Sequence, residues 1–137
     1  MVHALREAWR VLEPDGLLVD LRPATVHRRI GVLHGTRRRE VGVTRETFAN
    51  ETAANHAVAE VVADGLFLHE SRERCACLRK MDSLAEFRAW LDKFVRLEGL
   101  PSHDWLLERV KRALQSERGK NRIVVSAPLD LHVLKKA

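Results

Sequence analysis

The sequence contains no tyrosine, and its aromatic residues amount to only 5% of the chain. It therefore offers little material for the aromatic platforms on which RNA-binding modules stack bases. Cys75 and Cys77 are the only cysteines, and two cysteines this close in one extended segment cannot bridge comfortably. No apolar run reaches membrane-spanning length, and the N-terminus lacks the apolar core of a signal peptide. These absences favour a reducing, cytoplasmic setting and argue against export or membrane insertion.

Several motifs that carry chemistry are also missing. The seven glycines form no Gly-x-Gly, and no Gly-x-Ser-x-Gly is present. Cys75-x-Cys77 has no second paired motif to complete a zinc site, so we expect both cysteines to be small core residues. No metal site is predicted, because none of the scattered histidines forms a zinc-protease signature: His3, His27, His34, His56, His69, His103 and His132.

What remains is ordinary for a globular protein. The chain has 137 residues, of which 45% are apolar and 31% charged, so a single domain over 1–137 is expected. The net charge is +5 and the isoelectric point is near 9.8. A mild positive field favours anionic partners without identifying one.

Hydrophobic spacing predicts helices and strands in a mixed order. Apolar residues at helical spacing predict helices over 3–12 and 46–64, a third that begins at 83 and is closed by Gly99 and Pro101, and a fourth from 102 or 103 to near Gly119. Ser83 and Glu86 form a capping box at the third of these helices, and Trp90 and Trp105 are expected to pack the last two together. Extended segments are predicted over 17–21, 26–34, 38–44, 66–81 and 122–134, with a hairpin turn at 34–37.

Two strands carry more specific expectations. Leu17–Leu21 is a short continuous apolar run of the kind buried on both faces in a parallel sheet. In the last strand, alternation predicts one shared apolar face, made of Ile123, Val125, Ala127, Leu129, Leu131 and Val133, and Pro128 marks an edge or a bulge. The predicted fold is therefore α+β, or half of an α/β Rossmann-like fold. Its sheet is mixed and about five-stranded, with three to four helices.

The segment Ala4–Leu21, with its core Arg10-Val11-Leu12-Glu13-Pro14-Asp15-Gly16, resembles one family. In class I S-adenosylmethionine-dependent methyltransferases a helix ends in a similar turn and leads into the fifth strand of a Rossmann-like sheet. Here Glu13 stands where the family has Lys, and Asp15 where it has the first Gly. The resemblance implies that the helix at 46–64, the strand at 66–81 and the last strand fill the remaining places of that C-terminal half. In that arrangement the last strand is antiparallel, and the two helices between 83 and 117 are an insertion.

The same resemblance implies a missing cofactor site. In the family, S-adenosylmethionine lies over the first half of the sheet, against a glycine-rich turn and an acidic residue. The chain is expected to begin downstream of both, so the resemblance assigns no cofactor-binding residue, and no cofactor is expected for the isolated chain. Whether the chain is an enzyme stays open. Asp20 and Arg22, at the carboxyl end of the strand, fall on the substrate-side rim and are the site candidates.

Three hypotheses about function follow, in this order. The first is a truncated methyltransferase-like domain, non-catalytic alone, which pairs with another copy as a homodimer or with a separate cofactor-binding chain. The second is a small-ligand-binding protein or minor enzyme with a pocket between sheet and helices. The third is nucleic-acid binding through a basic hairpin, whose candidate residues are Arg28, Arg29, Arg37, Arg38 and Arg39.

Overall fold

The computed structural model describes residues 1–95, 102–116 and 118–137. Contacts between residues divide the chain into two compact units. Unit 1 comprises Met1–Thr25, Phe48–Cys75 and Pro128–Ala137, and unit 2 comprises Val26–Thr47 and Ala76–Ala127. Each unit is described by itself below. The expectation of a single domain over the whole chain stays a prediction.

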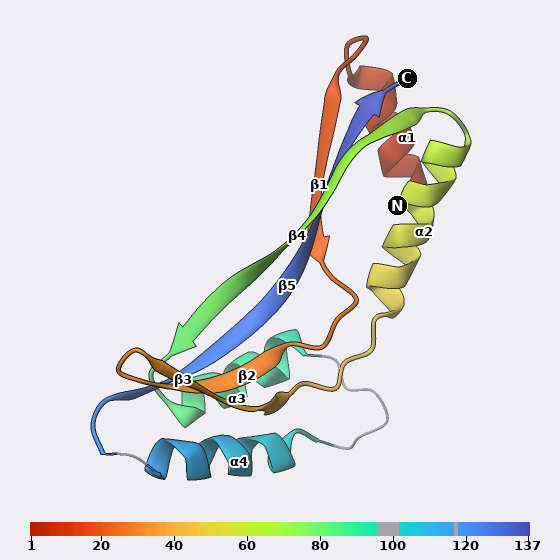
Figure 1. Ribbon diagram of the computed structural model, residues 1–137. Coiled ribbons are helices and arrows are strands. Elements are labelled where there is room, and N and C mark those ends of the chain that lie inside the picture. Colours follow the sequence, from red (N-terminus) through yellow and green to blue (C-terminus); the bar gives the residue numbers. More distant parts are fainter. Residues whose placement is uncertain (96–101, 117) are drawn as a thin grey trace. The chain divides into compact units, whose positions relative to one another are not determined.

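Among the described residues, the secondary structure consists of four helices and five strands (Figure 1), which confirms the α+β class. The elements run α1 (Val2–Val11), β1 (Leu17–Pro23), β2 (Arg29–His34), β3 (Arg37–Val43), α2 (Ala49–Ala63), β4 (Phe67–Met81), α3 (Leu84–Phe94), α4 (Asp104–Gln115) and β5 (Asn121–Lys136). No helix in the described part of the chain is both long enough and apolar enough to cross a membrane.

Strand β5 is the common partner within the sheet. In unit 1, β1 pairs antiparallel with the second part of β5, from Leu17 opposite Lys135 to Pro23 opposite Leu129. In unit 2, β2 pairs antiparallel with the first part of β5, and β3 pairs antiparallel with β2. Strand β4 also pairs with β5. The predicted hairpin of two strands around the turn at 34–37 is thus confirmed.

In unit 1 a tight turn connects α1 to β1. Asp15 adopts a φ of 59° in the left-handed region, where glycine is the usual residue. Its carboxylate lies 2.8 Å from the Lys135 ammonium group. Gly16 follows, and a Cβ there would lie only 2.8 Å from the Glu13 carbonyl oxygen. The residue after Asp15 therefore has to be glycine for the chain to enter β1 at this angle.

Helices α1 and α2 lie side by side and cover one face of the unit 1 strands (Figure 1). Their apolar stripes meet Phe67 of β4 and Leu134 of β5, both fully buried. The buried members of this core are Leu5, Ala57, Val58, Val61, Phe67 and Leu134. The stripe predicted for the second helix is thereby confirmed.

The opposite face of β1 is open, which corrects the expectation of a strand buried on both faces. Along β1, exposed and partly buried residues alternate. Leu17, Val19 and Leu21 have exposed fractions of 56%, 62% and 56%. The physical reason is that α1 and α2 cover only the face that carries Leu18, so the apolar run has one face without a cover.

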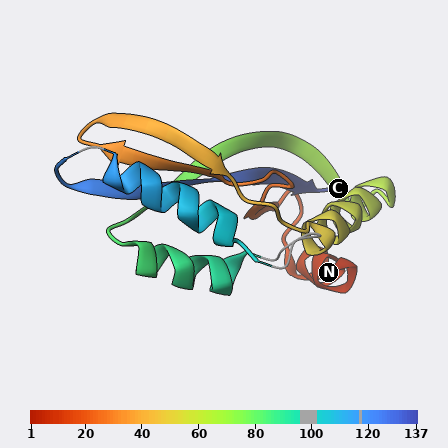
Figure 2. The ribbon, with the colours of Figure 1, turned by 90° about the horizontal axis from the view of Figure 1, so that it is seen from below.

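Unit 2 has its own core beneath α3 and α4, which lie together on one side of the β2–β3 hairpin (Figure 2). Helix α3 begins as predicted: the Ser83 hydroxyl oxygen accepts from the Glu86 amide at 3.1 Å, and the Glu86 carboxylate accepts from the Asp82 amide at 3.0 Å. Trp90 is buried in this core and Trp105 packs against it. Both tryptophans thus contribute to this core, and the expectation that they pack the two helices together stays a prediction.

The buried side of β5 changes along the strand, and this corrects the predicted face. In unit 2, Ile123 and Val125 are buried as predicted. In unit 1, Asp130, His132 and Leu134 are buried, whereas the expected Leu129, Leu131 and Val133 are only partly buried. Val124 is buried too, and Pro128, the predicted edge or bulge, is the first residue of the unit 1 part of this strand.

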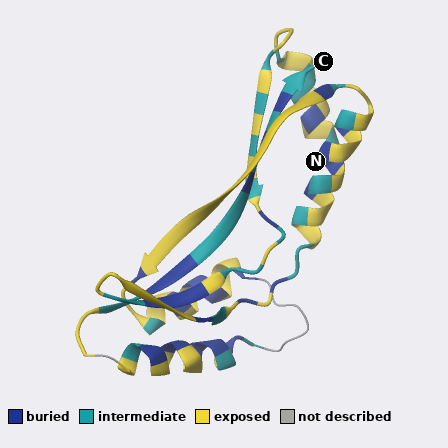
Figure 3. Cartoon of the chain, viewed as in Figure 1, coloured by how far each residue is buried: buried dark blue, intermediate teal, exposed yellow. Residues whose placement is uncertain are grey.

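Strand β4 is exposed between its two ends (Figure 3). Only Phe67 and Met81 are buried, and every residue between them is exposed. Cys75 and Cys77 are therefore free and exposed, so the expectation that they are core residues is wrong. It fails because no apolar core lies against the middle of this strand.

Candidate functional site in unit 1

A cluster of charged and imidazole side chains lies on the helix-covered face of unit 1. Strand register brings its members together, since Asp20 lies opposite His132 and Arg22 lies opposite Asp130. Both β1 residues are largely buried, with 16% of the Asp20 side chain and 13% of the Arg22 side chain exposed. The two rim candidates from the sequence therefore lie beside polar side chains from the last strand.

The Arg22 guanidinium is poorly satisfied. Its Nε lies 2.8 Å from Asp20 Oδ2, close enough for an ion pair. The contact lacks hydrogen-bond geometry, and all three guanidinium nitrogens are buried without a hydrogen bond to any described residue. A buried charge without hydrogen-bond partners is costly, so this arrangement calls for an explanation.

Asp130 binds two arginines from β4. Its carboxylate accepts from Arg74 Nε at 2.7 Å and Arg74 Nη2 at 3.0 Å, a bidentate contact, and from Arg72 Nη2 at 3.4 Å. Only 5% of the Asp130 side chain is exposed. The hydrogen bond from Arg74 lowers the pKa of Asp130 below its ordinary value of 3.8, so the carboxylate is ionised at neutral pH.

His132 and His69 form a pair. His132 Nδ1 and His69 Nε2 are 3.1 Å apart and the rings meet edge to face. Burial lowers the pKa of His132 below its ordinary value of 6.5, and the Arg22 and Arg72 guanidinium groups lower it further. His132 is therefore neutral at pH 7, and its Nε2 is buried with no hydrogen-bond partner among the described residues.

The histidine pair borders a pocket of about 270 Å³. One wall comes from α2 and the other from β4 and β5, and the lining residues are Asn55, Val58, Ala59, Val62, His69, Arg72 and His132. All of them belong to unit 1. The pocket thus combines an apolar wall with an imidazole and a guanidinium group, an arrangement suited to binding a small polar molecule.

In the described part of the chain, no three His, Cys, Asp or Glu side chains gather in a way that would hold a metal ion. The cluster is dominated by arginine and histidine, and its two carboxylates already contact guanidinium groups. Such a cluster of N–H donors suits the binding of an anion or of another hydrogen-bond acceptor.

The basic hairpin predicted from the sequence does not form a single patch. Arg29 lies opposite Val43, at the end of the hairpin away from the turn at 34–37. It pairs with Glu40 at 3.0 Å. Arg39 donates to the Ser116 hydroxyl at 3.4 Å and borders a surface depression with Arg109 and Arg112 of α4. The candidates separate because Arg29 begins the six-residue strand β2 and the turn lies at its other end.

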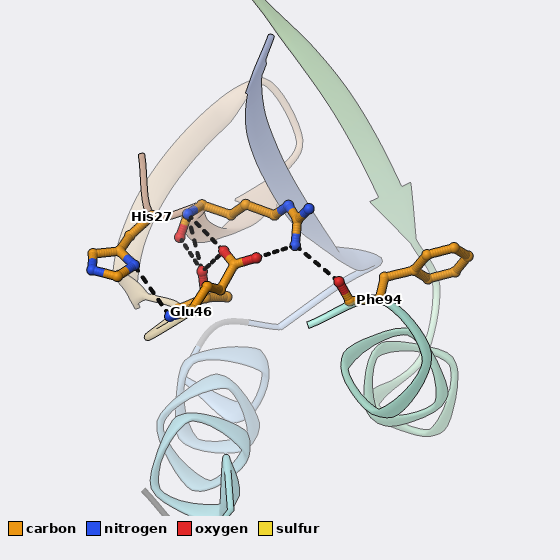
Figure 4. Close-up of polar contacts among 5 residues, drawn as sticks. His27, Glu46 and Phe94 are labelled. Atoms are coloured by element: carbon orange, nitrogen blue, oxygen red, sulfur yellow. Dashed lines mark hydrogen bonds and ion pairs between the residues drawn. The ribbon is translucent and has the colours of Figure 1, made fainter. Parts of the chain in front are cut away.

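Arg28 is committed to a buried network in unit 2 (Figure 4). Its guanidinium pairs with Glu46, donates to the Phe94 carbonyl oxygen at 3.3 Å and lies 5.6 Å from the Trp90 ring centroid. Glu46 also accepts from the Thr44 hydroxyl, and its own amide donates to His27 Nδ1 at 3.2 Å. Only 17% of the Arg28 side chain is exposed, so it is unsuited to binding nucleic acid.

Sequence reasoning missed most members of the unit 1 cluster. His69, Arg72, Asp130 and His132 are scattered singly along the chain and form no motif. Only the antiparallel register of β1 on β5 places Asp20 opposite His132, and that register cannot be read from spacing. The one usable signal was an even-numbered polar set, Asp130 and His132, in an otherwise apolar strand.

Comparisons with known proteins add no name to this geometry. No family model matches the chain, and neither a curated protein nor a solved structure does.

Proposed function

We propose that the chain acts by binding rather than by catalysis, and that its binding surface is β1, which pairs with a second copy of the same chain. The main support for this proposal is a row of apolar side chains on an edge strand. Leu17, Val19 and Leu21 form this row, and each is more than half exposed. An exposed, apolar edge strand is a ready template for pairing with another strand.

The other edge strands lack this property. The exposed part of β3 is Arg37-Arg38-Arg39-Glu40, and β4 carries charged residues on both sides of its uncharged stretch Cys75-Ala76-Cys77-Leu78. Charged side chains on an edge protect it from unwanted pairing. The charged residues within β1, Asp20 and Arg22, lie on the helix-covered face and contact each other, so nothing on the open face opposes association.

The sequence of β1 is self-complementary. An antiparallel pair with its two-fold axis at Val19 places Leu17 opposite Leu21 of the second copy and Val19 opposite its own equivalent. A two-fold interface needs such a pattern, because each patch must fit itself. Leu131 and Val133 of β5 lie opposite Leu21 and Val19 in the register and extend the apolar surface.

We also propose that the chain is related to the C-terminal half of class I methyltransferases. Supporting this are the helix–turn–strand formed by α1 and β1, the helix α2 before β4, and a last strand antiparallel to β1. On this proposal the isolated chain does not bind S-adenosylmethionine, and a separate cofactor-binding chain is the competing occupant of the β1 edge. The exposed, free thiols of Cys75 and Cys77 support a reducing, cytoplasmic location.

Nucleic-acid binding through the hairpin has less support. Arg28 is buried with Glu46 and Arg29 is paired with Glu40. Arg37, Arg38 and Arg39 stay exposed on β3, and Arg39 borders a depression with Arg109 and Arg112. Binding that weakens steeply with salt and is lost on Arg39→Gln would favour this alternative.

Sedimentation velocity tests self-association. We expect the wild-type chain to sediment as a dimer at about 100 μM and to dissociate on dilution, with a Kd on the order of 10 μM. Val19→Lys should be monomeric throughout, because it places a charge at the centre of the interface. Leu78→Lys is the matched control, since Leu78 is also 56% exposed but lies in unit 2. A wild-type chain that is monomeric at the highest concentration would refute the proposal.

A further inference from the structure

The pocket in unit 1 carries an inference that is independent of self-association. We propose that the pocket between α2 and strands β4 and β5 binds a small carboxylate with a short aliphatic chain. The argument rests on the charges around the pocket, on one unpartnered buried nitrogen and on the apolar wall.

The lining of the pocket contains one charged group, and it is a cation. Arg72 is the only charged residue that lines the pocket, and its partner Asp130 also contacts Arg74. Because Arg74 already holds Asp130 in a bidentate contact, the single 3.4 Å contact from Arg72 is weaker. Arg72 lines the pocket and its side chain is 54% exposed, so its remaining donors can reach a ligand carboxylate.

The second group is His132, which is buried to more than nine-tenths. It lines the pocket, and its Nε2 has no hydrogen-bond partner among the described residues. When His69 Nε2–H donates to His132 Nδ1, the neutral His132 ring carries its proton on Nε2 and becomes a donor. In that tautomer His132 Nε2–H is a donor without a partner among the described residues, on a side chain that lines the same pocket as Arg72.

The wall formed by α2 determines which part of the ligand is apolar. Val58, Ala59 and Val62 line it, together with the amide of Asn55. An apolar wall favours an aliphatic chain, and a volume of about 270 Å³ suits a ligand smaller than a typical drug molecule. A short-chain carboxylate fits both the polar and the apolar half, whereas a free phosphate would leave the apolar wall unused.

Butyrate is the probe, and NMR titration of the full chain is the measurement. We expect saturable shifts of the His132 ring and of the Val58 and Val62 methyl groups. Inorganic phosphate, which has no chain, and 1-butanol, which has no charge, should each bind at least five-fold more weakly. Phosphate binding as tightly as butyrate, or no saturation with butyrate, would overturn the proposal.

Four single-residue variants test whether butyrate binds in the pocket or elsewhere on the chain. Arg72→Gln should weaken butyrate at least five-fold, and Arg38→Gln, at an exposed strand position in unit 2, should leave it unchanged. Ala59→Phe fills the pocket from an exposed helix position and should abolish binding. The matched control is Ala53→Phe, at an exposed position of α2 that does not line the pocket. Since none of these residues lies on β1, the variants should leave sedimentation unchanged. Equal binding by Ala59→Phe and the wild-type chain would show that butyrate binds elsewhere.

Discussion

Removing Arg28 tests the buried ion pair of unit 2. The Glu46 side chain is only 6% exposed, so Arg28→Met leaves a carboxylate buried without its cation. Breaking such a pair costs about 3–5 kcal/mol. We expect about 3 kcal/mol, at the lower end, because the Thr44 hydroxyl and the Arg28 backbone amide still face Glu46. That loss corresponds to roughly a 150-fold change in the unfolding equilibrium.

A double-mutant cycle makes the prediction specific. Arg28→Met combined with Glu46→Leu removes both charges and should return to within about 1 kcal/mol of the wild-type chain. Urea unfolding followed by tryptophan fluorescence is the assay, in a Trp9→Phe background, because the remaining tryptophans lie in unit 2. Arg29→Met is the control for an exposed pair and should cost less than about 1 kcal/mol. The reasoning would be refuted if Arg28→Met lost as little unfolding free energy as Arg29→Met. It would also be refuted if the double variant lost the sum of the two single losses.

Three further predictions concern unit 1 and the cofactor. Because the folded state holds the pKa of His132 below 6.5, the unfolded chain binds more protons below that pH. The free energy of unfolding of the wild-type chain should therefore fall from pH 7.5 to 5.5. The fall should be less steep in His132→Gln and as steep as in the wild-type chain in His3→Gln, the control at an exposed site. Equal slopes in the wild-type chain and both variants would contradict the lowered pKa of His132. Phe67→Ala should cost about 3–5 kcal/mol in urea unfolding, and Leu68→Ala, at a site 56% exposed, less than about 1 kcal/mol; similar losses would contradict the assigned core. Calorimetric titration of the isolated chain with S-adenosylmethionine should give no binding heat, and micromolar binding would refute the proposed absence of a cofactor site.

Local signals in the sequence predicted much of the secondary structure. The capping box at Ser83 and the apolar stripes of the helices depend on residues three or four positions apart, so spacing alone reveals them. The hairpin turn at 34–37 was readable for the same reason. These elements form in the predicted order within one or two residues at most boundaries.

Burial of strands was harder to predict, because it depends on what covers each face. The apolar run of β1 reads as buried on both sides, yet only α1 and α2 cover it, and Val19 stays exposed. In β5, alternation predicted Leu131 and Val133 as core, whereas α2 packs on the set that contains His132 and Leu134. The candidate site was half predictable: Asp20 and Arg22 follow from their place in the strand, but their neighbours depend on long-range register.

Hydrogen exchange along β1 is the most direct test of the claim that this edge pairs with a second copy. Among the described residues β1 pairs only with β5, so its other edge is open, and pairing with a second strand would protect the amides there from exchange. We expect protection of the peptide covering Leu17–Pro23 to rise with protein concentration, from about 1 μM to about 100 μM. The peptide covering Arg37–Val43, another edge strand, should not change. Equal exchange of the β1 peptide across this range would contradict the account.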